Sequence, residues 1–327
     1  MLGQDFQRYN ENGAANGARV EIMNCYRIGV DGGGTTTRAV IIDGARNEVL
    51  ARAQSGSSNL YNLGLDGALA NIRLAIESAL ELAGMTANQM ESWGFGLAGA
   101  AGEHEKSLWT TALRAVYGED VVVEEDVVAA LVGAFGPDEL KQNGGAVLIA
   151  GTGSNCFGQN ANGVRVRVDG WGPMLGDRGS GFWLGESAIR QAVAAIDGAG
   201  EGTTLSSALL EHFAVSDLNA LVGVIYAPNF ARDRIAAFVP FVLNAARAGD
   251  EVSLRLLREC GIQLSSTARA ALEPLRLQQL ALCGGLIENA PEIRDSLAQA
   301  LNGVELVTPR FEPVVGAALL PLLEREA

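Results

Sequence analysis

The stretch Ile28-Gly-Val-Asp31-Gly-Gly-Gly-Thr-Thr-Thr-Arg38 decides the fold of this chain of 327 residues. The apolar, β-branched run that ends at Val30 predicts a buried strand, and Asp31 closes it just before three glycines. A helix usually follows a glycine loop that binds phosphate, but here the threonines lead into strand-forming residues 39–42. The stretch therefore predicts a β-hairpin with an acid at its first corner, and neither a Rossmann turn nor a Walker loop.

Glycines in this bend would let backbone N–H groups approach a ligand and would permit positive φ. A plain tight turn, the alternative, needs only one or two glycines and has no use for the carboxylate or the hydroxyls. We therefore predict a phosphate-binding hairpin, in which Asp31 holds Mg²⁺ directly or through water. The residues expected to contact nucleotide phosphates here are Gly32, Gly33, Gly34, Thr35, Thr36 and Arg38.

Composition narrows the class of partner. The net charge of −14 argues against nucleic acid and anionic membranes as partners, and favours a bound Mg²⁺ if the ligand is a polyphosphate. The two lysines, Lys106 and Lys141, do not follow a glycine loop, which excludes a Walker-type lysine. The four cysteines form no C-x-x-C pair and indicate reduced thiols of a cytoplasmic protein, and no run is apolar enough to span a bilayer.

Two α/β domains are expected after a disordered tail at residues 1–23. Strands and helices alternate through residues 24–137 and predict an N-terminal domain. Residues 138–327 begin in the same way, with strand 146–150, the bend Gly151–Asn155 and a return strand at 156–158. This repetition predicts a duplicated fold with two phosphate-binding hairpins, the second using Gly151, Thr152 and Gly153. A helical insertion, with a break or kink at Pro240, belongs to the second domain, and the packing of the last helix onto the first domain is left open.

Phosphoryl transfer also needs a group that orients the attacking hydroxyl. The run Glu124-Glu125-Asp126 directly follows the short strand 121–123, at the edge where open α/β sheets place their ligands, and the Asp126 carboxylate could accept a proton. Taken alone, a helix N-cap explains this aspartate better.

Glycine-rich segments in the second half offer further candidates. The segment 169–185 is too rich in glycine for a regular element; its Trp171 is of the kind that stacks on a sugar ring, whereas packing is the better explanation for Trp183. Asp177 could bind substrate hydroxyls, and a turn aspartate is an equal alternative. Gly284 and Gly285 lie between a strand and a helix, where a flat ring could rest on bare backbone or the chain could simply turn.

Together, four ordered motifs resemble those of N-acetylglucosamine and glucosamine kinases: Asp31–Arg38, Ala150–Asn155, Gly170–Asp177 and Cys283–Gly285. These kinases belong to the actin-like ATPase and sugar kinase superfamily, in the branch that includes ATPase subunits of benzoyl-CoA reductase type. The resemblance runs from about residue 26 to the C-terminus. It implies two ribonuclease-H-like domains with a central cleft, which holds ATP and, deeper in, the sugar.

The resemblance also implies roles for individual residues. Asp126 matches the catalytic base, which reverses the N-cap interpretation, and Gly284 with Gly285 matches the adenosine motif. The positions on the sugar side are Asn59, Thr152, Trp171 and Asp177. Arg178 stands where many relatives carry Glu, which puts the choice of sugar in doubt.

We therefore expect a cytoplasmic, ATP- and Mg²⁺-dependent kinase that phosphorylates N-acetylglucosamine or glucosamine at a hydroxyl, most plausibly the 6-OH. One alternative is an ATPase that energises a partner reductase or dehydratase, although such activators use cysteines to bind an iron–sulfur cluster and the spacing here does not fit. The other is a non-catalytic sugar or nucleotide sensor, which would have no need of a base at Asp126. Homodimerisation is left open.

Overall fold

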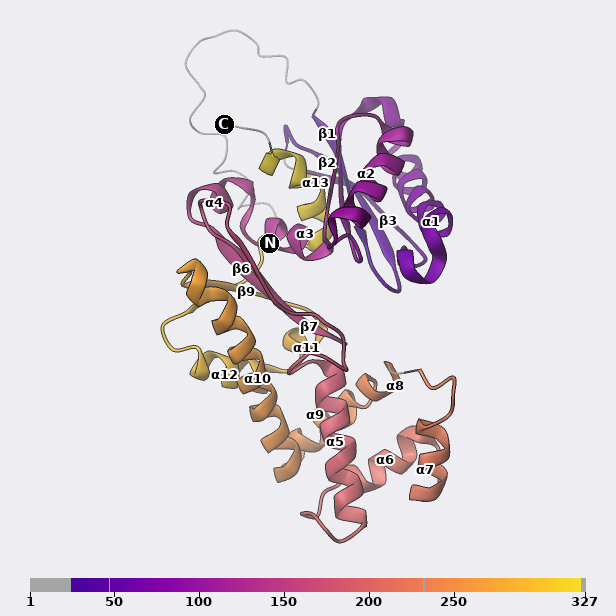
Figure 1. The fold of residues 1–327 in the computed structure, drawn as a ribbon, viewed down its shortest axis with the longest axis vertical. Helices are drawn as coiled ribbons and strands as arrows, with labels where there is room; N and C mark the ends of the chain where they lie inside the picture. The colour runs from indigo at the N-terminus through magenta and orange to yellow at the C-terminus, as the bar shows by residue number, and fades with distance from the viewer. Residues whose placement is uncertain (1–24, 47, 232, 325–327) are drawn as a thin grey trace. The chain divides into compact units, whose positions relative to one another are not determined.

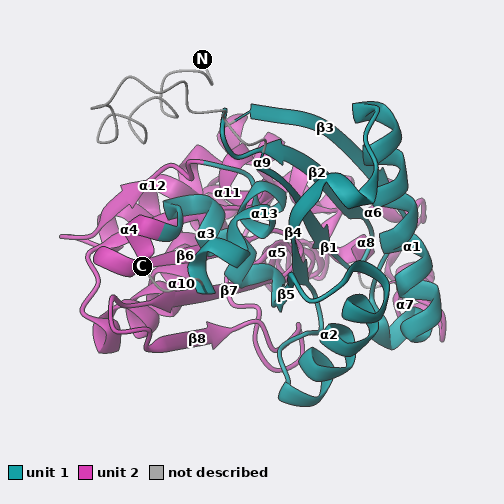
Figure 2. Cartoon of the chain, turned by 90° about the horizontal axis from the view of Figure 1, so that it is seen from above, with its two compact units in different colours: residues 1–137, 311–327 teal, residues 138–310 magenta. Residues whose placement is uncertain are grey.

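The structure is a computed structural model that describes residues 25–46, 48–231 and 233–324, so the tail expected at residues 1–23 lies outside the described residues. The chain divides into two compact units, distinguished by colour in Figure 2. Unit 1 comprises residues 1–137 and 311–327, and unit 2 comprises residues 138–310. The second expected domain ran on to residue 327, whereas the structure assigns the last 17 residues to unit 1.

Unit 1 is built on one five-stranded sheet in the order β3-β2-β1-β4-β5. Its strands are β1 (Tyr26–Gly32), β2 (Thr37–Asp43), β3 (Glu48–Ser55), β4 (Met90–Leu97) and β5 (Val121–Glu124). Its helices are α1 (Leu60–Ala83), the 3₁₀ turn η2 (Ala87–Gln89), α2 (Glu103–Tyr117), α3 (Asp126–Phe135) and α13 (Pro313–Glu324). The opening stretch forms the hairpin β1–β2, as its composition predicts.

Helix α13 packs closely against one face of this sheet because glycines on the strands leave room for its backbone. A side chain at Gly29 on β1 would overlap the carbonyl of Val314, and one at Gly94 on β4 would overlap that of Ala317. Gly316 of α13 approaches the Ala129 carbonyl of α3 in the same way. The C-terminal helix therefore lies closer to the strands than side chains would allow.

Unit 2 repeats the same strand topology. Its sheet has the order β10-β9-β6-β7-β8, in which β6–β7–β8 are antiparallel and β9 and β10 run parallel to β6. The strands are β6 (Gly145–Ala150), β7 (Ser154–Gln159), β8 (Arg165–Asp169), β9 (Gln279–Cys283) and β10 (Glu305–Val307). Counted from the antiparallel edge, this is the arrangement of unit 1, which accords with an internal duplication.

Nine helices complete the described part of unit 2 (Figure 1). They are α4 (Pro137–Gln142, which starts at the boundary), α5 (Gly181–Ile196), α6 (Leu205–Phe213), α7 (Leu218–Ile225), α8 (Asp233–Ala236), α9 (Val239–Arg247), α10 (Glu251–Leu275), α11 (Gly285–Asn289) and α12 (Pro291–Ala300). The sequence predicts a break or kink at Pro240, and the helical region does break just before it: α8 ends at Ala236 and α9 begins at Val239. Pro240 lies in the first turn of α9, where its missing N–H costs nothing.

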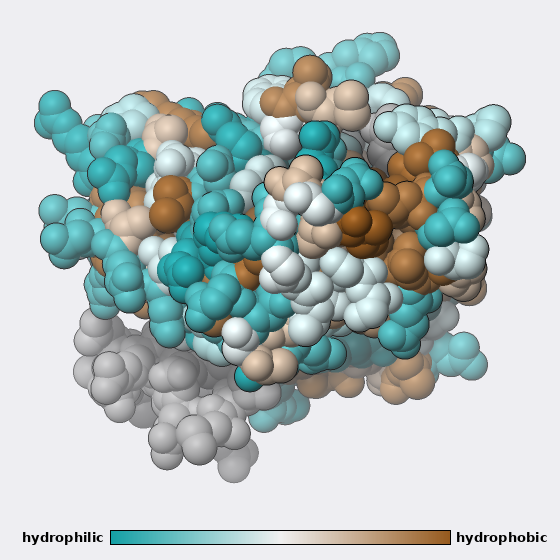
Figure 3. Space-filling view, turned by 90° about the horizontal axis from the view of Figure 1, so that it is seen from below, coloured by the Kyte–Doolittle hydropathy of each residue, from teal (hydrophilic) through white to brown (hydrophobic). Residues whose placement is uncertain are grey.

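The surface of the molecule is mixed. Figure 3 shows one face on which hydrophilic residues predominate and smaller hydrophobic areas lie among them. Among the described helices, no single one has both the length and the hydropathy to cross a bilayer, and only the bent pair α6 and α7 reaches that threshold together.

Candidate active site

Two carboxylates converge at the end of the unit 1 sheet. Asp31 lies in β1 opposite Gly96 of β4, and Gly96 in turn lies opposite Glu124 of β5. Because Gly96 has no side chain, the first residue of α3, Asp126, sits close above the sheet: its Cα is 3.5 Å from where a Cβ on Gly96 would be. The glycine between the two strands therefore lets Asp126 approach Asp31.

The environment of Asp31 reflects this approach. Burial, and next the negative charge of Asp126, raise the pKa of Asp31 to about 6, against the opposing effect of the Arg38 guanidinium, whose Nη1 lies 3.4 Å from Asp31 Oδ2. The neighbouring Glu124 is buried and forms an ion pair with Lys106 at 3.1 Å, so it has a structural partner. In the described part of the chain, no group of three or more His, Cys, Asp or Glu side chains could hold a metal by itself.

Asp126 does not occupy the N-cap position of its helix. Glu125 is the N-cap of α3 and makes no side-chain cap hydrogen bond, whereas Asp126 is the first helical residue and its Oδ1 accepts from the Val127 N–H at 2.8 Å. An acid in the first turn of a helix interacts favourably with the helix dipole. The capping alternative is therefore wrong by one position.

The glycines of the first hairpin differ in what surrounds them. Gly32 is required by packing, since a Cβ there would overlap Ser58 Oγ. A Cβ on Gly34 would meet no atom of the described protein within 4 Å, and none of Gly32, Gly33 and Gly34 has a positive φ, contrary to one reason expected for them. Neither packing nor backbone conformation explains glycine at position 34, so the hairpin leaves room for a ligand to approach its backbone.

The substitution Gly34→Ala should therefore separate ligand binding from folding. We expect the free energy of unfolding to change by less than about 1 kcal/mol, while ATP affinity falls about tenfold or more, about 1.4 kcal/mol. Gly94→Ala is the contrast, because its Cβ would overlap α13; overpacking of this kind costs about 1–3 kcal/mol or more. Thermal unfolding and calorimetric ATP titration give both quantities, and unchanged ATP affinity in Gly34→Ala would show that the hairpin does not bind phosphate.

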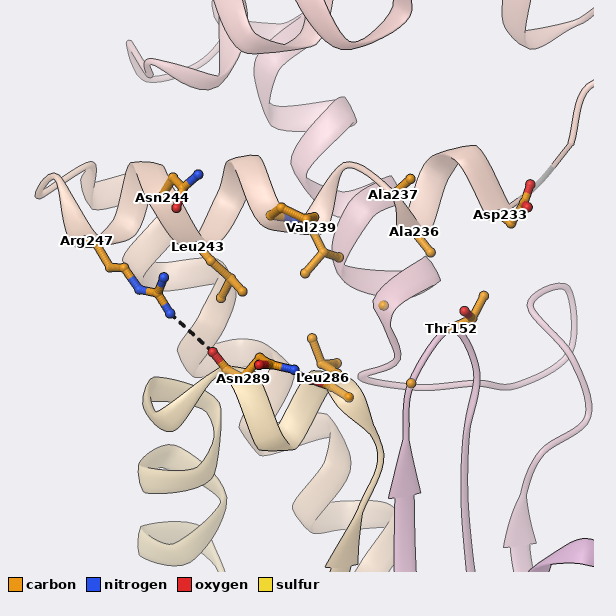
Figure 4. A pocket seen from close by; sticks show the side chains of 14 residues that line it. Thr152, Asp233, Ala236, Ala237, Val239, Leu243, Asn244, Arg247, Leu286 and Asn289 are labelled. Carbon is orange, nitrogen blue, oxygen red and sulfur yellow. Dashed lines mark hydrogen bonds between the residues drawn. The ribbon is translucent and has the colours of Figure 1, made fainter. Parts of the chain in front are cut away.

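Unit 2 contains a pocket of about 730 Å³ next to the second hairpin. Figure 4 shows Val239 and Leu243 of α9 on one side of it, Leu286 of α11 on the other, and Thr152 at the tip of the hairpin. Gly151 and Gly285 also line it, so two motifs predicted separately contribute to one cavity. Gly284 has φ 103° and a side chain there would overlap the Ala150 carbonyl, which explains the first glycine of this turn.

Apart from Thr152, the polar side chains of this pocket were not predicted from the sequence. Arg247 donates from Nη2 to the Asn289 carbonyl at 3.2 Å, drawn as the dashed line in Figure 4, and Asn289 donates from Nδ2 to the Gly285 carbonyl at 2.7 Å. Asn244 of α9 lines the same end. Val239, Leu243 and Arg247 are spaced four residues apart, which places them on one face of a helix. The sequence does not show that this face lines a pocket, because that depends on the element that lies opposite.

The glycine-rich segment after β8 is braced by a buried acid. Asp169 is 1% exposed, and its carboxylate accepts from the N–H groups of Gly170, Asp177 and Arg178 and from Arg178 Nε at 3.1 Å. Burial opposes ionisation of Asp169, but these hydrogen bonds outweigh it and lower its pKa. Asp169 and Asp177 have φ of 70° and 57°, a conformation that Asp tolerates better than most residues.

Asp177 lies directly against the second hairpin. Its carboxylate would be 2.9 Å from a Cβ on Gly153, and Ser154 Oγ donates to the Arg178 carbonyl at 2.8 Å. Burial, together with the charge of Asp169, raises the pKa of Asp177, and the Ser154 and Gly172 N–H groups act in the opposite direction. The loop of residues 169–180, which we call the Asp177 loop, thus fixes a carboxylate beside Gly151–Asn155.

The remaining predicted residues are placed as follows. Trp171 is 63% exposed on the Asp177 loop, with the Arg167 guanidinium 5.8 Å from the centre of its ring, whereas Trp183 packs against the unit 2 core. Asn59 is the N-cap of α1, and its Oδ1 accepts from Asn62 N–H at 3.0 Å. Asn59 belongs to unit 1 with Asp31, Arg38 and Asp126; Thr152, Trp171, Asp177, Gly284 and Gly285 belong to unit 2.

Similarity to known proteins places the chain in a family. A model of the BadF/BadG/BcrA/BcrD ATPase family matches residues 28–321. The chain belongs to this ATPase family. Among its relatives, an N-acetylmuramic acid/N-acetylglucosamine kinase of Clostridium acetobutylicum is 29% identical over 304 residues, which cover 90% of this chain and 97% of the relative. An N-acetyl-D-glucosamine kinase of Dictyostelium discoideum is 30% identical over 314 residues, which cover 90% of this chain and 97% of the relative.

Solved structures agree on the fold of this ATPase family member. A Chromobacterium violaceum protein with the provisional name N-acetylglucosamine kinase has a TM-score of 0.73 at 29% identity, covering 91% of this chain and 99% of the other. A ROK family glucokinase of Streptomyces griseus, in complex with glucose and AMPPNP, has a TM-score of 0.57 at 20% identity, with 90% and 98% covered, and shows the fold alone. The mixed α/β chain with two five-stranded sheets therefore has the sugar kinase and actin-like ATPase fold.

Proposed function

We propose that this protein is an ATP-dependent sugar kinase that phosphorylates an N-acetylated or free amino sugar, N-acetylglucosamine or glucosamine, at its 6-OH. The curated relatives named as N-acetylglucosamine and glucosamine kinases support the reaction and the substrate class. The name of the Clostridium relative adds N-acetylmuramic acid, which carries a carboxylate, to the sugars worth testing. We further propose that units 1 and 2 correspond to the two ribonuclease-H-like domains of the superfamily.

The observation that carries this proposal is the joining of the second hairpin to the α9–α11 pocket. The pocket has apolar walls from Val239, Leu243 and Leu286, polar groups from Arg247 and Asn289 at one end, and Gly151 and Thr152 at the other. Ligand sites for nucleotides combine an apolar slot with a few fixed polar groups. The adenine ring would lie between α9 and α11, and the phosphates would extend towards the backbone of the Gly151–Gly153 turn.

The unit 1 hairpin fits a magnesium-bound polyphosphate. Mg²⁺ is usually bound by one or two carboxylates together with substrate phosphates, and it does not need an all-protein cage. Asp31, with Asp126 near it and open space above Gly34, offers that donor set. Mg²⁺ held by Asp31 would neutralise charge on the transferred phosphoryl group.

In the transfer step, the sugar hydroxyl attacks the γ-phosphorus as the bond from that phosphorus to the β–γ bridging oxygen breaks, and ADP leaves. Asp126 accepts the hydroxyl proton. Backbone N–H groups of the hairpins and the Arg38 guanidinium stabilise the phosphoryl oxygens. Asp177, beside the second hairpin, accepts hydrogen bonds from the sugar hydroxyls, while Asn59, Thr152 and Trp171 complete the sugar contacts.

Sugar dependence of ADP release tests this function. We expect ADP production to rise steeply when N-acetylglucosamine or glucosamine is added to the protein with ATP and Mg²⁺, because the hydroxyl is the phosphoryl acceptor. A coupled ADP assay over a panel of hexoses and hexosamines measures it, and mass spectrometry of the product identifies the phosphorylated position. Equal ATP hydrolysis with and without sugar would favour an ATPase that energises a partner, and no turnover with ATP still bound would favour a sensor.

A further inference from the structure

The outward charge of the Asp177 loop is positive, although two of its three charged residues are acids. Asp169 is enclosed and its carboxylate is occupied by three backbone N–H groups and Arg178 Nε. Asp177 is 8% exposed, whereas the side chain of Arg178 is 54% exposed. The charge that this loop presents to its surroundings is therefore mainly the guanidinium of Arg178.

Arg178 is also held more firmly than an ordinary surface arginine. Its N–H and its Nε both donate to Asp169 Oδ2, at 3.0 and 3.1 Å, and its carbonyl accepts from Ser154 Oγ at 2.8 Å. Within the described residues, Asp169 is its sole ion-pair partner. Because Nε binds Asp169, the two terminal nitrogens of Arg178 remain available to a ligand. The side chain is already ordered, so little conformational entropy is lost when a ligand binds.

A second positive group, Arg167, lies beside the same loop. The Arg167 guanidinium stacks near the ring of Trp171, and its Nη2 would be 3.3 Å from a Cβ on Gly170. In a protein of net charge −14, Arg178 thus presents a positive charge at the position that follows Asp177 in the sequence, and Arg167 adds another beside the Asp177 loop. Such a site suits a polyhydroxyl ligand, and its cationic rim suits a neutral or anionic substituent better than a cationic one.

We propose that Arg178 determines substrate specificity by charge: the site favours N-acetylated amino sugars that are neutral or carry a carboxylate, and disfavours a sugar with a free, protonated amine. This inference rests on the proposed sugar kinase function. An ammonium group near the exposed guanidinium would be repelled, whereas a carboxylate could accept two hydrogen bonds from its terminal nitrogens. Acetylation of the amine removes the repelled charge.

The test compares kcat/KM for N-acetylglucosamine, N-acetylmuramic acid and glucosamine at pH 7 in the wild type and in three variants. In Arg178→Gln, we expect the preference for the carboxylate sugar over the neutral one to fall about tenfold, equivalent to about 1.4 kcal/mol, and the relative rate with glucosamine to rise. Arg178→Lys keeps the charge but cannot reproduce the Nε geometry, so it should retain most of the preference. Arg190→Gln, which removes an exposed arginine from α5, should leave all three ratios unchanged.

Salt dependence distinguishes charge from loop geometry. Raising the ionic strength should shrink the wild-type preference among the three sugars and should have little effect on the ratios of Arg178→Gln, because screening acts on an exposed charge. Ratios in Arg178→Gln equal to those of the wild type would overturn the inference while leaving the kinase function intact. Asp177→Ala should weaken all three sugars alike; a wild type that phosphorylates none of them would overturn the kinase function and this inference together.

Discussion

Asp126→Asn is expected to lower kcat by about 10²–10⁴-fold, the range that general base catalysis supplies. The carboxylate form of an aspartate can accept the proton of a sugar hydroxyl, whereas the amide of asparagine cannot act as a base in its place. Asparagine keeps the size of the side chain and an oxygen that can accept from the Val127 N–H, as Asp126 Oδ1 does. Folding and both binding constants should therefore change little.

Steady-state kinetics with sugar and ATP, combined with thermal unfolding, measure this effect. Asp138→Asn is a matched control, because Asp138 is an exposed acid in the first turn of another helix, α4. A variant that folds, binds both ligands and keeps most of its turnover would show that Asp126 serves only the start of α3. Catalysis would then have to rely on positioning of the hydroxyl alone.

Asp31→Asn is expected to reduce turnover by about 10²–10³-fold and to raise the Mg²⁺ concentration needed for half-maximal activity. A bound metal ion stabilises the charge of the transition state by several kcal/mol, and each 1.36 kcal/mol that is lost lowers the rate tenfold. The substitution keeps the shape of the side chain but removes the negative charge that faces Asp126 and Arg38. Nucleotide binding without Mg²⁺ should change little, because the hairpin N–H groups remain.

A magnesium titration of the rate checks this prediction, with Asp66→Asn on the exposed side of α1 as the control. Calorimetry with ATP in the presence and absence of Mg²⁺ separates metal binding from nucleotide binding. An unchanged magnesium requirement together with lower activity would assign Asp31 to a different role, such as orientation of Arg38.

Local signals predicted the strands and hairpins well, because turn residues and β-branched runs fix them over short distances. Helix α2 begins at Glu103 and ends at Tyr117, as its flanking glycines predict. A proline at the start of an apolar stretch predicts a helix over residues 313–324, and α13 has these bounds. The spacing of apolar residues predicts a helix from Leu65 to Leu82, whereas α1 runs from Leu60 to Ala83. The difference is a short helical segment that precedes a kink at Gly64, whose φ of 67° and ψ of 173° are not helical, so the predicted start coincides with the helix after the kink.

Features that depend on distant partners could not be predicted in the same way. Asp169 appeared only as the first residue of a glycine-rich segment, and its role as the brace for Asp177 and Arg178 depends on a loop that returns eight residues later. The role of α9 as one wall of the pocket could not be predicted either, because it depends on where α11 lies. At the Asp31–Asp126 site, both aspartates were predicted from the sequence. Their close approach depends on Gly96, and the sequence alone does not show that Gly96 lies between β1 and β5.

The return of α13 to unit 1 has a consequence for how this protein is made. The strands that hold Asp31 are synthesised first, but the groove over Gly29 and Gly94, with Val40 and Ile42 beside it, is covered by Phe311 and α13. Domains generally fold as units during synthesis from the N-terminus, yet unit 1 stays incomplete on the ribosome until the final helix emerges. A chain that stops before residue 311 would leave this apolar groove exposed, and we expect such a truncated copy to aggregate or be degraded more readily than one that includes α13.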